Sequence, residues 1–516
     1  MTMRDYADHA TTGATAESLE AFEQASHELR CYIDDPVASV ERALAASPGM
    51  TMAHVLKAWL HLLGTESAGL PVARDSLRAA RALPANARER GHLTAIDLLL
   101  EGRWRAAARV LEDVSVDHPR DALALQAGHL LDFFTGDSRM LRDRIARALP
   151  AWSASQPGHH AVLGMYAFGL EECGQYTLAE RYGRLCVGQQ HRDGWGWHAV
   201  AHVMEMQGRT ADGIEWLSGN VDAWSQDSFF AVHNAWHLAL FHLELGRIDE
   251  TLEQFDGPIH GLRSSAVVDL IDASALLWRL QLRGADVDTR WETVADAWAP
   301  AADAGNYAFN DWHAMMAFVG SGRLKAQQAV LESLEAVAVT GTGDTAAFAR
   351  EVGLDAARAI QAFGERRYTD AVALLRPLRG HAQRFGGSHA QRDLIDLTLL
   401  EAAIRGGQHS LAAALAAERV AQRPESPLNP LLLARTGCDA APADAMHAVT
   451  TVATGRNPPS GRGERAASCD ATTSAHPSAM PALPCAARSA PETAADPEPP
   501  RVPATCADTN AFRLRH

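Results

Sequence analysis

Apolar residues recur along the first 420 residues at the three- and four-residue spacing of amphipathic helices, and most of these apolar runs end at a glycine. Ten such glycines follow one another at intervals of 34 to 43 residues, which is room for two helices and two short turns. The sequence therefore predicts a repeated helix pair with a glycine at the turn inside each pair. The glycines are Gly64, Gly102, Gly136, Gly174, Gly208, Gly246, Gly284, Gly322, Gly364 and Gly407.

A second amphipathic run with alanine at a packing position follows most of these glycines, as in residues 102–112, 174–185 and 364–375. Glycine ends the first helix because it tolerates positive φ, and alanine lets the second helix lie close against the first. The pattern resembles the tetratricopeptide repeat, and this resemblance implies an all-α solenoid of helix pairs that forms a right-handed superhelix. An irregular helical bundle with coincidental glycines is the alternative.

Three segments are expected along the chain: an N-terminal arm (1–16), a helical-repeat domain (17–423) and a C-terminal tail (424–516). The tail holds 14 of the 24 prolines and four of the seven cysteines, and it shows no helical period. Proline at that density breaks helices, so the tail is expected to be disordered. A natural tail and an out-of-frame translation both remain open.

Composition and charge narrow the classes of partner. The 516 residues carry a net charge of −16, from 47 Lys and Arg against 63 Asp and Glu, without a basic stripe. A nucleic-acid partner is not expected, because phosphates would be repelled. The sequence shows neither a stretch long enough to span a membrane nor an apolar leader at its start, so we expect no membrane partner and a cytoplasmic location.

Sequence motifs with known chemistry are scarce. No CxxC pair occurs, so neither a disulfide framework nor a cysteine zinc site is indicated. The nucleophile elbow GxSxG, the phosphate-binding P-loop and the zinc-protease motif HExxH are also missing. Any chemistry must therefore come from side chains that the repeats bring together.

Histidines recur at the same place in adjacent repeats. His198 and His202 are four residues apart before Gly208, with Glu205 on the same helical stripe, and His233 and His237 repeat the spacing before Gly246. The first helix of each pair would line a concave groove, so these side chains are expected to share it.

Imidazoles one helical turn apart can bind a transition metal from one face, and a carboxylate can complete the set. Asp311 and His313, two units further on, are further candidate ligands. The candidate metal ligands are His198, His202, His233, His237 and His313. Two other interpretations stay open: packed histidines that only form hydrogen bonds, and a groove for a peptide or small molecule.

Several segments resemble the tetratricopeptide repeat protein 38 family of helical-repeat proteins. They lie in order between about residues 15 and 435 and include residues 52–60, 164–184, 198–209, 233–246, 272–280, 309–323 and 386–393. The resemblance implies a tetratricopeptide-like solenoid, and it implies no established reaction. It also directs attention to GGSHAQRD (386–393), where Ser388 can cap a helix and His389, Arg392 and Asp393 form a charged cluster. This cluster is either a cap with a local ion pair or a ligand site.

We expect a non-enzymatic scaffold that binds a protein segment or a small ligand in its concave groove, because stacked helix pairs form a long groove without a recognisable reactive group. No cofactor is expected for this function. The alternative is a metal-dependent enzyme that uses a divalent transition metal on the histidine cluster, with Glu205 as proton acceptor.

Overall fold

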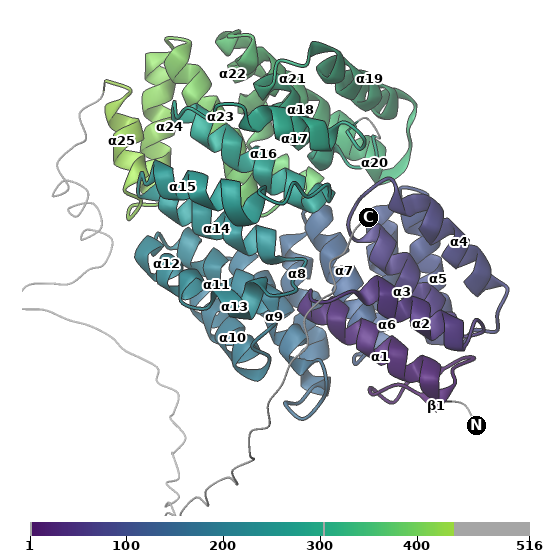
Figure 1. Ribbon diagram of the computed structural model, residues 1–516. Helices are drawn as coiled ribbons and strands as arrows, with labels where there is room; N and C mark the ends of the chain where they lie inside the picture. The colour runs from purple at the N-terminus through teal and green to yellow at the C-terminus, as the bar shows by residue number, and fades with distance from the viewer. Residues whose placement is uncertain (1–2, 303–304, 438–516) are drawn as a thin grey trace, which may run out of the picture. The chain divides into compact units, whose positions relative to one another are not determined.

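Helices make up almost all of the computed structural model, which describes residues 3–302 and 305–437 (Figure 1). The predicted all-α fold is confirmed. Among the described residues the helices form eleven consecutive pairs, each packed as a hairpin. The first helices are α1 (Ala16–Cys31), α3 (Thr51–Leu62), α5 (Ala87–Leu100), α7 (Ala122–Phe134), α9 (His159–Glu172), α11 (Gly194–Met206), α14 (Ala231–Glu244), α16 (Val267–Leu282), α18 (Ala308–Gly320), α21 (Leu354–Gly364) and α23 (His389–Arg405).

The second helices are shorter on average, and several short elements connect the pairs. The second helices are α2 (Pro36–Ala46), α4 (Gly69–Arg81), α6 (Trp104–Asp117), α8 (Ser138–Ala148), α10 (Tyr176–Gln189), α12 (Thr210–Ser218), α15 (Ile248–Gln254), α17 (Arg290–Trp298), α19 (Leu324–Thr340), α22 (Tyr368–Leu378) and α24 (His409–Gln422). The other elements are β1 (Met3–Arg4), β2 (Ala10–Thr11), α13 (Val221–Ser225), α20 (Gly343–Phe348), α25 (Leu428–Ala434), the 3₁₀ helices η1 (Leu149–Ala151) and η4 (Ala382–Phe385), and the π-helices η2 (Phe255–Ile259) and η3 (Ala349–Gly353).

Eight of the ten predicted turn glycines lie between the two helices of a pair with φ between 68° and 79°. Gly64 and Gly364 do not have positive φ. Thr65, one residue after Gly64, and Arg366, two residues after Gly364, take the left-handed conformation instead, with φ of 60° and 61°. Gly364 is the last residue of α21, and a Cβ there would lie 2.2 Å from Val319 Cγ1. This glycine therefore serves close helix packing rather than the turn.

Small residues hold the helix pairs together, as the alanine pattern predicts. Ala107, Ala179 and Ala371, near the start of second helices in three of the pairs, are fully buried. The first helices α9, α11, α14, α16, α18 and α21 pack in this order, each on the next. Side chains from successive repeats therefore meet in one continuous layer of helices.

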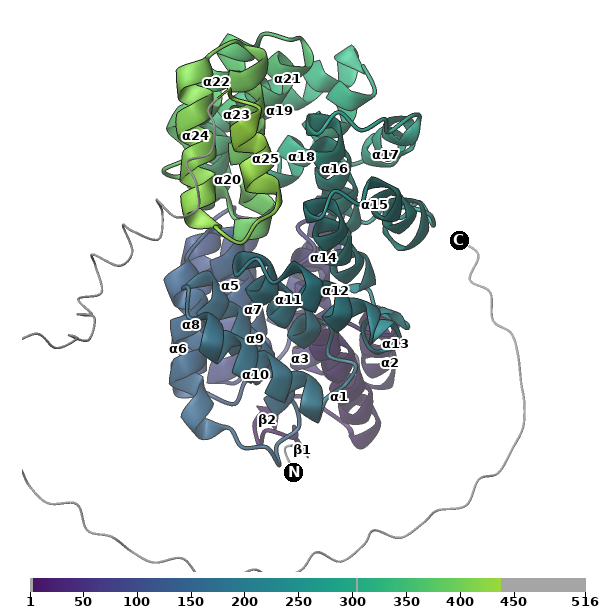
Figure 2. The same cartoon turned by 90° about the vertical axis from the view of Figure 1, so that its left-hand side faces the viewer.

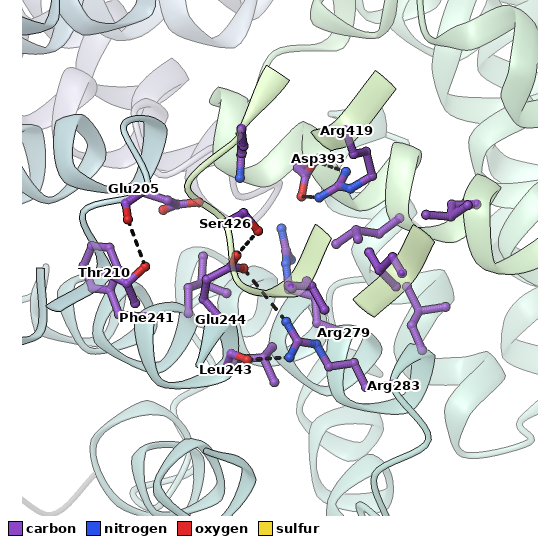
Figure 3. Close-up of a pocket in the computed structure, with 18 of the residues that line it drawn as sticks. Glu205, Thr210, Phe241, Leu243, Glu244, Arg279, Arg283, Asp393, Arg419 and Ser426 are labelled. Carbon is purple, nitrogen blue, oxygen red and sulfur yellow. Dashed lines mark hydrogen bonds and ion pairs between the residues drawn. The ribbon is translucent and has the colours of Figure 1, made fainter. Parts of the chain in front are cut away.

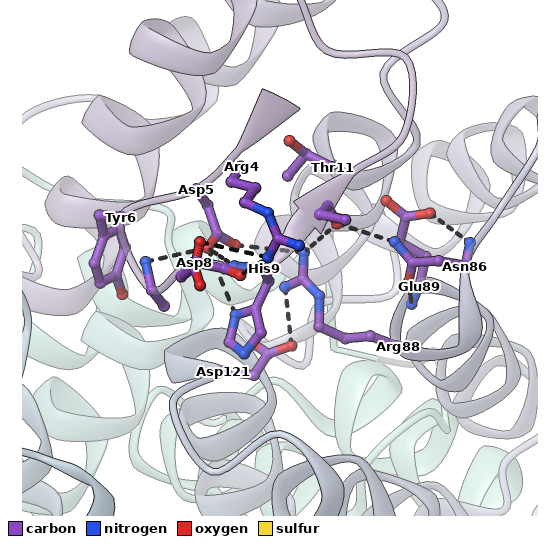
Figure 4. Close-up of polar contacts among 12 residues, drawn as sticks. Arg4, Asp5, Tyr6, Asp8, His9, Thr11, Asn86, Arg88, Glu89 and Asp121 are labelled. Atoms are coloured by element: carbon purple, nitrogen blue, oxygen red, sulfur yellow. Dashed lines mark hydrogen bonds and ion pairs between the residues drawn. The ribbon is translucent and has the colours of Figure 1, made fainter. Parts of the chain in front are cut away.

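The N-terminal segment is more ordered than the predicted arm (Figure 4). Strands β1 and β2 pair antiparallel, and the Asn86 side-chain amide donates to the carbonyl of Ala10 at 2.9 Å. The buried Arg88 side chain lies 3.4 Å from Asp5 and 3.1 Å from Asp121. The hairpin is thus fastened to α5 and to the start of α7.

The predicted boundary at residue 423 is wrong, because α25 continues the helical packing to Ala434. The Asn429 amide donates to the carbonyl of Arg419 at 3.0 Å, and the Ser426 hydroxyl donates to Glu244. The prediction took the high number of prolines as a sign that no helix forms here. Pro427 and Pro430 are compatible with α25 because they lie at its start, where backbone amides have no hydrogen-bond partner within the helix. The rest of the predicted tail, 438–516, lies outside the described residues.

Segments about 200 residues apart in the chain touch one another. A bridge joins Ile33 to Ser228, so that the end of α1 lies beside the segment after α13 (Figure 2). The Asn306 amide donates to the carbonyl of Thr65 at 2.9 Å, and the amide of Asp344 donates to the carbonyl of Gly102 at 2.8 Å. These contacts join early and later repeats at the face on which a groove was predicted, and a cavity that is partly open to solvent lies there.

None of the helices in the described part of the chain combines the length and the apolar character needed to cross a bilayer.

Candidate functional site

Four histidines meet between two neighbouring first helices. His198 and His202 lie one turn apart on α11, and His233 and His237 repeat this spacing on α14, which packs against α11. Each of the four offers a ring nitrogen, and all four nitrogens lie within 4.8 Å of one another. The structure therefore brings these four predicted residues together. We call this set the histidine quartet.

The rings of the quartet are in close contact. Nε2 of His198 lies 3.1 Å from Nε2 of His233. The ring centroids of His198 and His202 are 4.4 Å apart, as are those of His202 and His237. The rings of these pairs cross at 86° and 63°, so the edge of one ring meets the face of the other.

Three carboxylates from three helices lie next to the Nδ1 atoms of three quartet rings. Oδ2 of Asp272 on α16 lies 2.8 Å from Nδ1 of His233, and Oε2 of Glu205 on α11 lies 3.0 Å from Nδ1 of His237. Oε2 of Glu171 on α9 is 3.7 Å from Nδ1 of His202. A carboxylate at Nδ1 holds the proton there and leaves the Nε2 lone pair free.

Burial keeps three members of the quartet uncharged. His198, His202 and His237 are at most 2% exposed. Burial first, and the neighbouring imidazoles second, hold the pKa of these three histidines well below the ordinary value. They are therefore neutral at pH 7 and each offers a lone pair.

Four buried ring nitrogens of the quartet have no hydrogen-bond partner within the described ranges: Nδ1 of His198, both nitrogens of His202 and Nε2 of His237. Buried polar atoms are nearly always partnered. His92 shows the usual pattern, because its Nδ1 accepts from the Trp59 indole at 3.2 Å and its Nε2 lies 3.0 Å from Asp121. The quartet departs from it, as do His129 and His313, which also have buried ring nitrogens without a partner in the described ranges. The convergence of its four nitrogens distinguishes the quartet from these two residues.

The predicted contribution of α18 to the quartet is wrong. His313 is buried on α18, where its Nδ1 donates to the carbonyl of Phe309 at 2.8 Å, and burial lowers its pKa to about 3. Asp311 is also buried on α18, and neither residue belongs to the group of converging nitrogens. The reason is that α16 packs between α14 and α18 and supplies Asp272 in their place.

The charged cluster at the start of α23 joins other helices. Ser388 caps α23, as predicted, by accepting from the amide of Gln391. His389 Nδ1 lies 3.5 Å from Glu172 on α9, and Arg392 also contacts Glu172 at 3.5 Å. Asp393 pairs with Arg419 on α24 at 2.6 Å. The ion pairs are thus long-range rather than local.

A cavity of about 440 Å³ lies beside the quartet, and His198 and His233 form part of its wall. Polar side chains also line the cavity, from Asp34, Asp35, Thr65, Asp269, Asp272, Asn310, Ser388 and Gln391. Most of the lining is aromatic or aliphatic. The aromatic residues are Tyr32, Phe133, Phe134, Phe168, Trp195, Phe229, Phe230, Tyr307 and Phe309.

A second, smaller cavity of about 70 Å³ lies on the other side of Glu205 (Figure 3). Arg279 is buried there, with its guanidinium 5.3 Å from the Trp236 ring centre and donating to the carbonyl of Ala390 at 2.5 Å. Burial lowers the pKa of Arg279 to about 10. Glu205 therefore stands between a buried cation and the quartet.

The sequence analysis missed Glu171, Asp272 and the aromatic cavity. Asp272 lies within the mostly apolar helix α16, Glu171 lies next to Glu172 at the end of the apolar part of α9, and both are almost fully buried. A carboxylate inside an apolar run is the signal that points to such a partner.

A search against models of known protein families finds none that matches this chain.

Proposed function

We propose that the protein binds a small, mainly apolar molecule in the aromatic cavity, with a polar end toward His198, His233 and Asp272. The observation that carries this proposal is the cavity itself, which has about 440 Å³ and a lining in which aromatic and aliphatic residues outnumber the polar ones. Ligand cavities in proteins usually have about 300–1,000 Å³ and the same mixture of lining groups.

The size of the cavity favours a small ligand over a protein segment. Contacts such as Asn306 with Thr65 cross the face on which a peptide groove was predicted and shorten the space along it. A small molecule with one hydrogen-bonding end needs only the space and the polar wall that are present. Membership of the tetratricopeptide repeat protein 38 family is proposed as well, on the helix pairs and the quoted segments.

A fluorescent apolar probe tests the proposal. Anilinonaphthalene sulfonate brightens in apolar cavities, and we expect saturable binding to the folded chain that quenches Trp195 emission. Leu130→Trp fills the cavity and should weaken probe binding at least about tenfold.

Leu185→Trp is the matched control, because Leu185 is 45% exposed on α10 and lies outside the cavity lining. Circular dichroism shows whether both variants fold. Equal loss of probe binding in both variants, or no saturable binding to the unmodified chain, would contradict the proposal.

A further inference from the structure

We infer that the histidine quartet is a binding site for one divalent transition-metal ion. The site consists of His198, His202, His233 and His237, and the inference does not depend on what the aromatic cavity binds. The observations that carry it are the converging ring nitrogens, their missing hydrogen bonds and the carboxylates behind them.

The spacing of the nitrogens suits a tetrahedral ion. Zinc binds imidazole nitrogens at about 2.0–2.1 Å, so four ligands in a tetrahedron are about 3.3 Å apart. Nε2 of His198 and Nε2 of His233 are 3.1 Å apart, and all four offered nitrogens fall within 4.8 Å. Small ring rotations are enough to close the set around an ion.

The carboxylates give the quartet the arrangement typical of metal-bound histidines. Ligand histidines usually donate their second ring nitrogen to a carboxylate, which fixes the ring and directs the other nitrogen to the metal. Asp272 does this for His233, and Glu205 does it for His237. In both rings Nε2 is the nitrogen left for the ion.

Charge balance also favours a cation. Three acidic side chains, Glu171, Glu205 and Asp272, lie next to the rings, and Arg279 near Glu205 is the buried cation described above. Both Glu171 oxygens are buried without a hydrogen-bond partner in the described structure. A divalent ion at the quartet would lower the electrostatic cost of burying these groups.

The donor set selects the kind of metal. Imidazole ligands suit zinc, cobalt, nickel, copper and ferrous iron, whereas magnesium and calcium prefer oxygen ligands. His198 and His233 belong to the wall of the aromatic cavity, so a bound ion would lie next to a molecule held there.

Cobalt titration of the full, untagged chain tests the inference. After the chain is stripped with a chelator, cobalt(II) is added, and the visible absorption of tetrahedral cobalt and the bound metal per chain are measured. We expect one ion per chain at saturation. Zinc should displace the cobalt and remove the absorption.

His198→Leu/His202→Leu removes two ligands and puts apolar side chains of similar size where three nitrogens lack partners. We expect this variant to fold and to lose the stoichiometric cobalt signal. His313→Leu is the matched control, since His313 is equally buried but outside the quartet, and it should still take up one ion.

Asp272→Asn keeps all four ligands and covers the case in which the double variant does not fold. It should weaken the apparent cobalt affinity by about 10- to 100-fold while one ion per chain still binds. No uptake by the unmodified chain, or unchanged affinity in this variant, would overturn the inference. Probe binding without metal uptake would overturn the metal site alone and leave the proposed cavity function intact.

Discussion

Asp272 on α16 accepts a hydrogen bond from Nδ1 of His233 on α14, over 2.8 Å. A carboxylate can only accept, so this contact keeps a proton on Nδ1 of His233, and Nε2 of the same ring faces Nε2 of His198 at 3.1 Å. One contact between adjacent repeats thus sets the chemical state of the residue that belongs to both the quartet and the cavity wall.

Asp272→Asn should change that state. An amide can also donate, so the variant no longer enforces one tautomer, and nitrogen NMR of His233 should show a mixture instead of the Nδ1-protonated form. The free energy of unfolding should fall by about 1 kcal/mol, since a charge-assisted hydrogen bond becomes a neutral one. Asp269→Asn is the control, because Asp269 lines the same cavity but hydrogen-bonds to Ser264. An unchanged His233 tautomer in Asp272→Asn would contradict the assignment.

Glycine-to-alanine variants separate the two roles of glycine in the helix pairs. Gly322 has φ of 70° and open space around it, so Gly322→Ala should lose about 1–2 kcal/mol through backbone strain alone. Gly364→Ala should also destabilise, by a clash with Val319. Gly188→Ala is the control, since this helical glycine has open space and should gain about 0.5–1 kcal/mol. Denaturant unfolding measures all three, and equal effects at Gly322 and Gly188 would argue against the strained turn.

Asp121 should make stability depend on acid pH. Burial alone would raise the pKa of Asp121, but His92 and Arg88 outweigh it and hold the pKa below the ordinary value. The charged form of Asp121 therefore adds to the free energy of unfolding at pH values above about 3.9, the pKa of an aspartate in the unfolded chain. This stabilisation is lost as the pH falls below that value.

Asp121→Asn should cost about 2–4 kcal/mol at pH 7, because it leaves Arg88 without one of its two carboxylates. The difference from the unmodified chain should shrink in urea unfolding at pH 3. The exposed neighbour Asp117 supplies the control variant, Asp117→Asn, which should be nearly neutral. A difference that stays constant between the two pH values would refute the role of the Asp121 charge.

Asn429 should matter for stability although it lies beyond the predicted end of the repeat domain. Its amide donates to the carbonyls of Arg419 and Arg423, and it is almost fully buried. Asn429→Ala should cost about 1–3 kcal/mol, because two buried carbonyls lose a donor. Leu431→Ala on the exposed side of α25 is the comparison and should cost much less. Thermal unfolding of the full chain distinguishes the two.

The repeated glycines were sufficient to predict the helix pairs, because a left-handed residue at fixed intervals is a local property. Gly208 and Gly322 both have the expected positive φ. The shortening of the groove was not predictable in the same way. It depends on contacts such as Asn306 with Thr65, which join segments far apart in sequence and leave no period in the chain.

The candidate site was predictable to the extent that its members share a helical register. His198, His202, His233 and His237 were found because a four-residue spacing recurs at the same distance before two turn glycines. Asp272 and Glu171 were missed because they lie on other repeats, and only the packing of α16 and α9 brings them to the rings. Asp311 and His313 were included wrongly, since spacing alone does not show which helix lies between two others.

The most direct test of the account is an anomalous difference map from crystals of the cobalt-loaded full chain, recorded at the cobalt absorption edge. The account predicts one strong peak among His198, His202, His233 and His237, with Asp272 and Glu205 still on the outer nitrogens of their histidines. A map without a peak at the quartet, or with cobalt only at other residues, would contradict it.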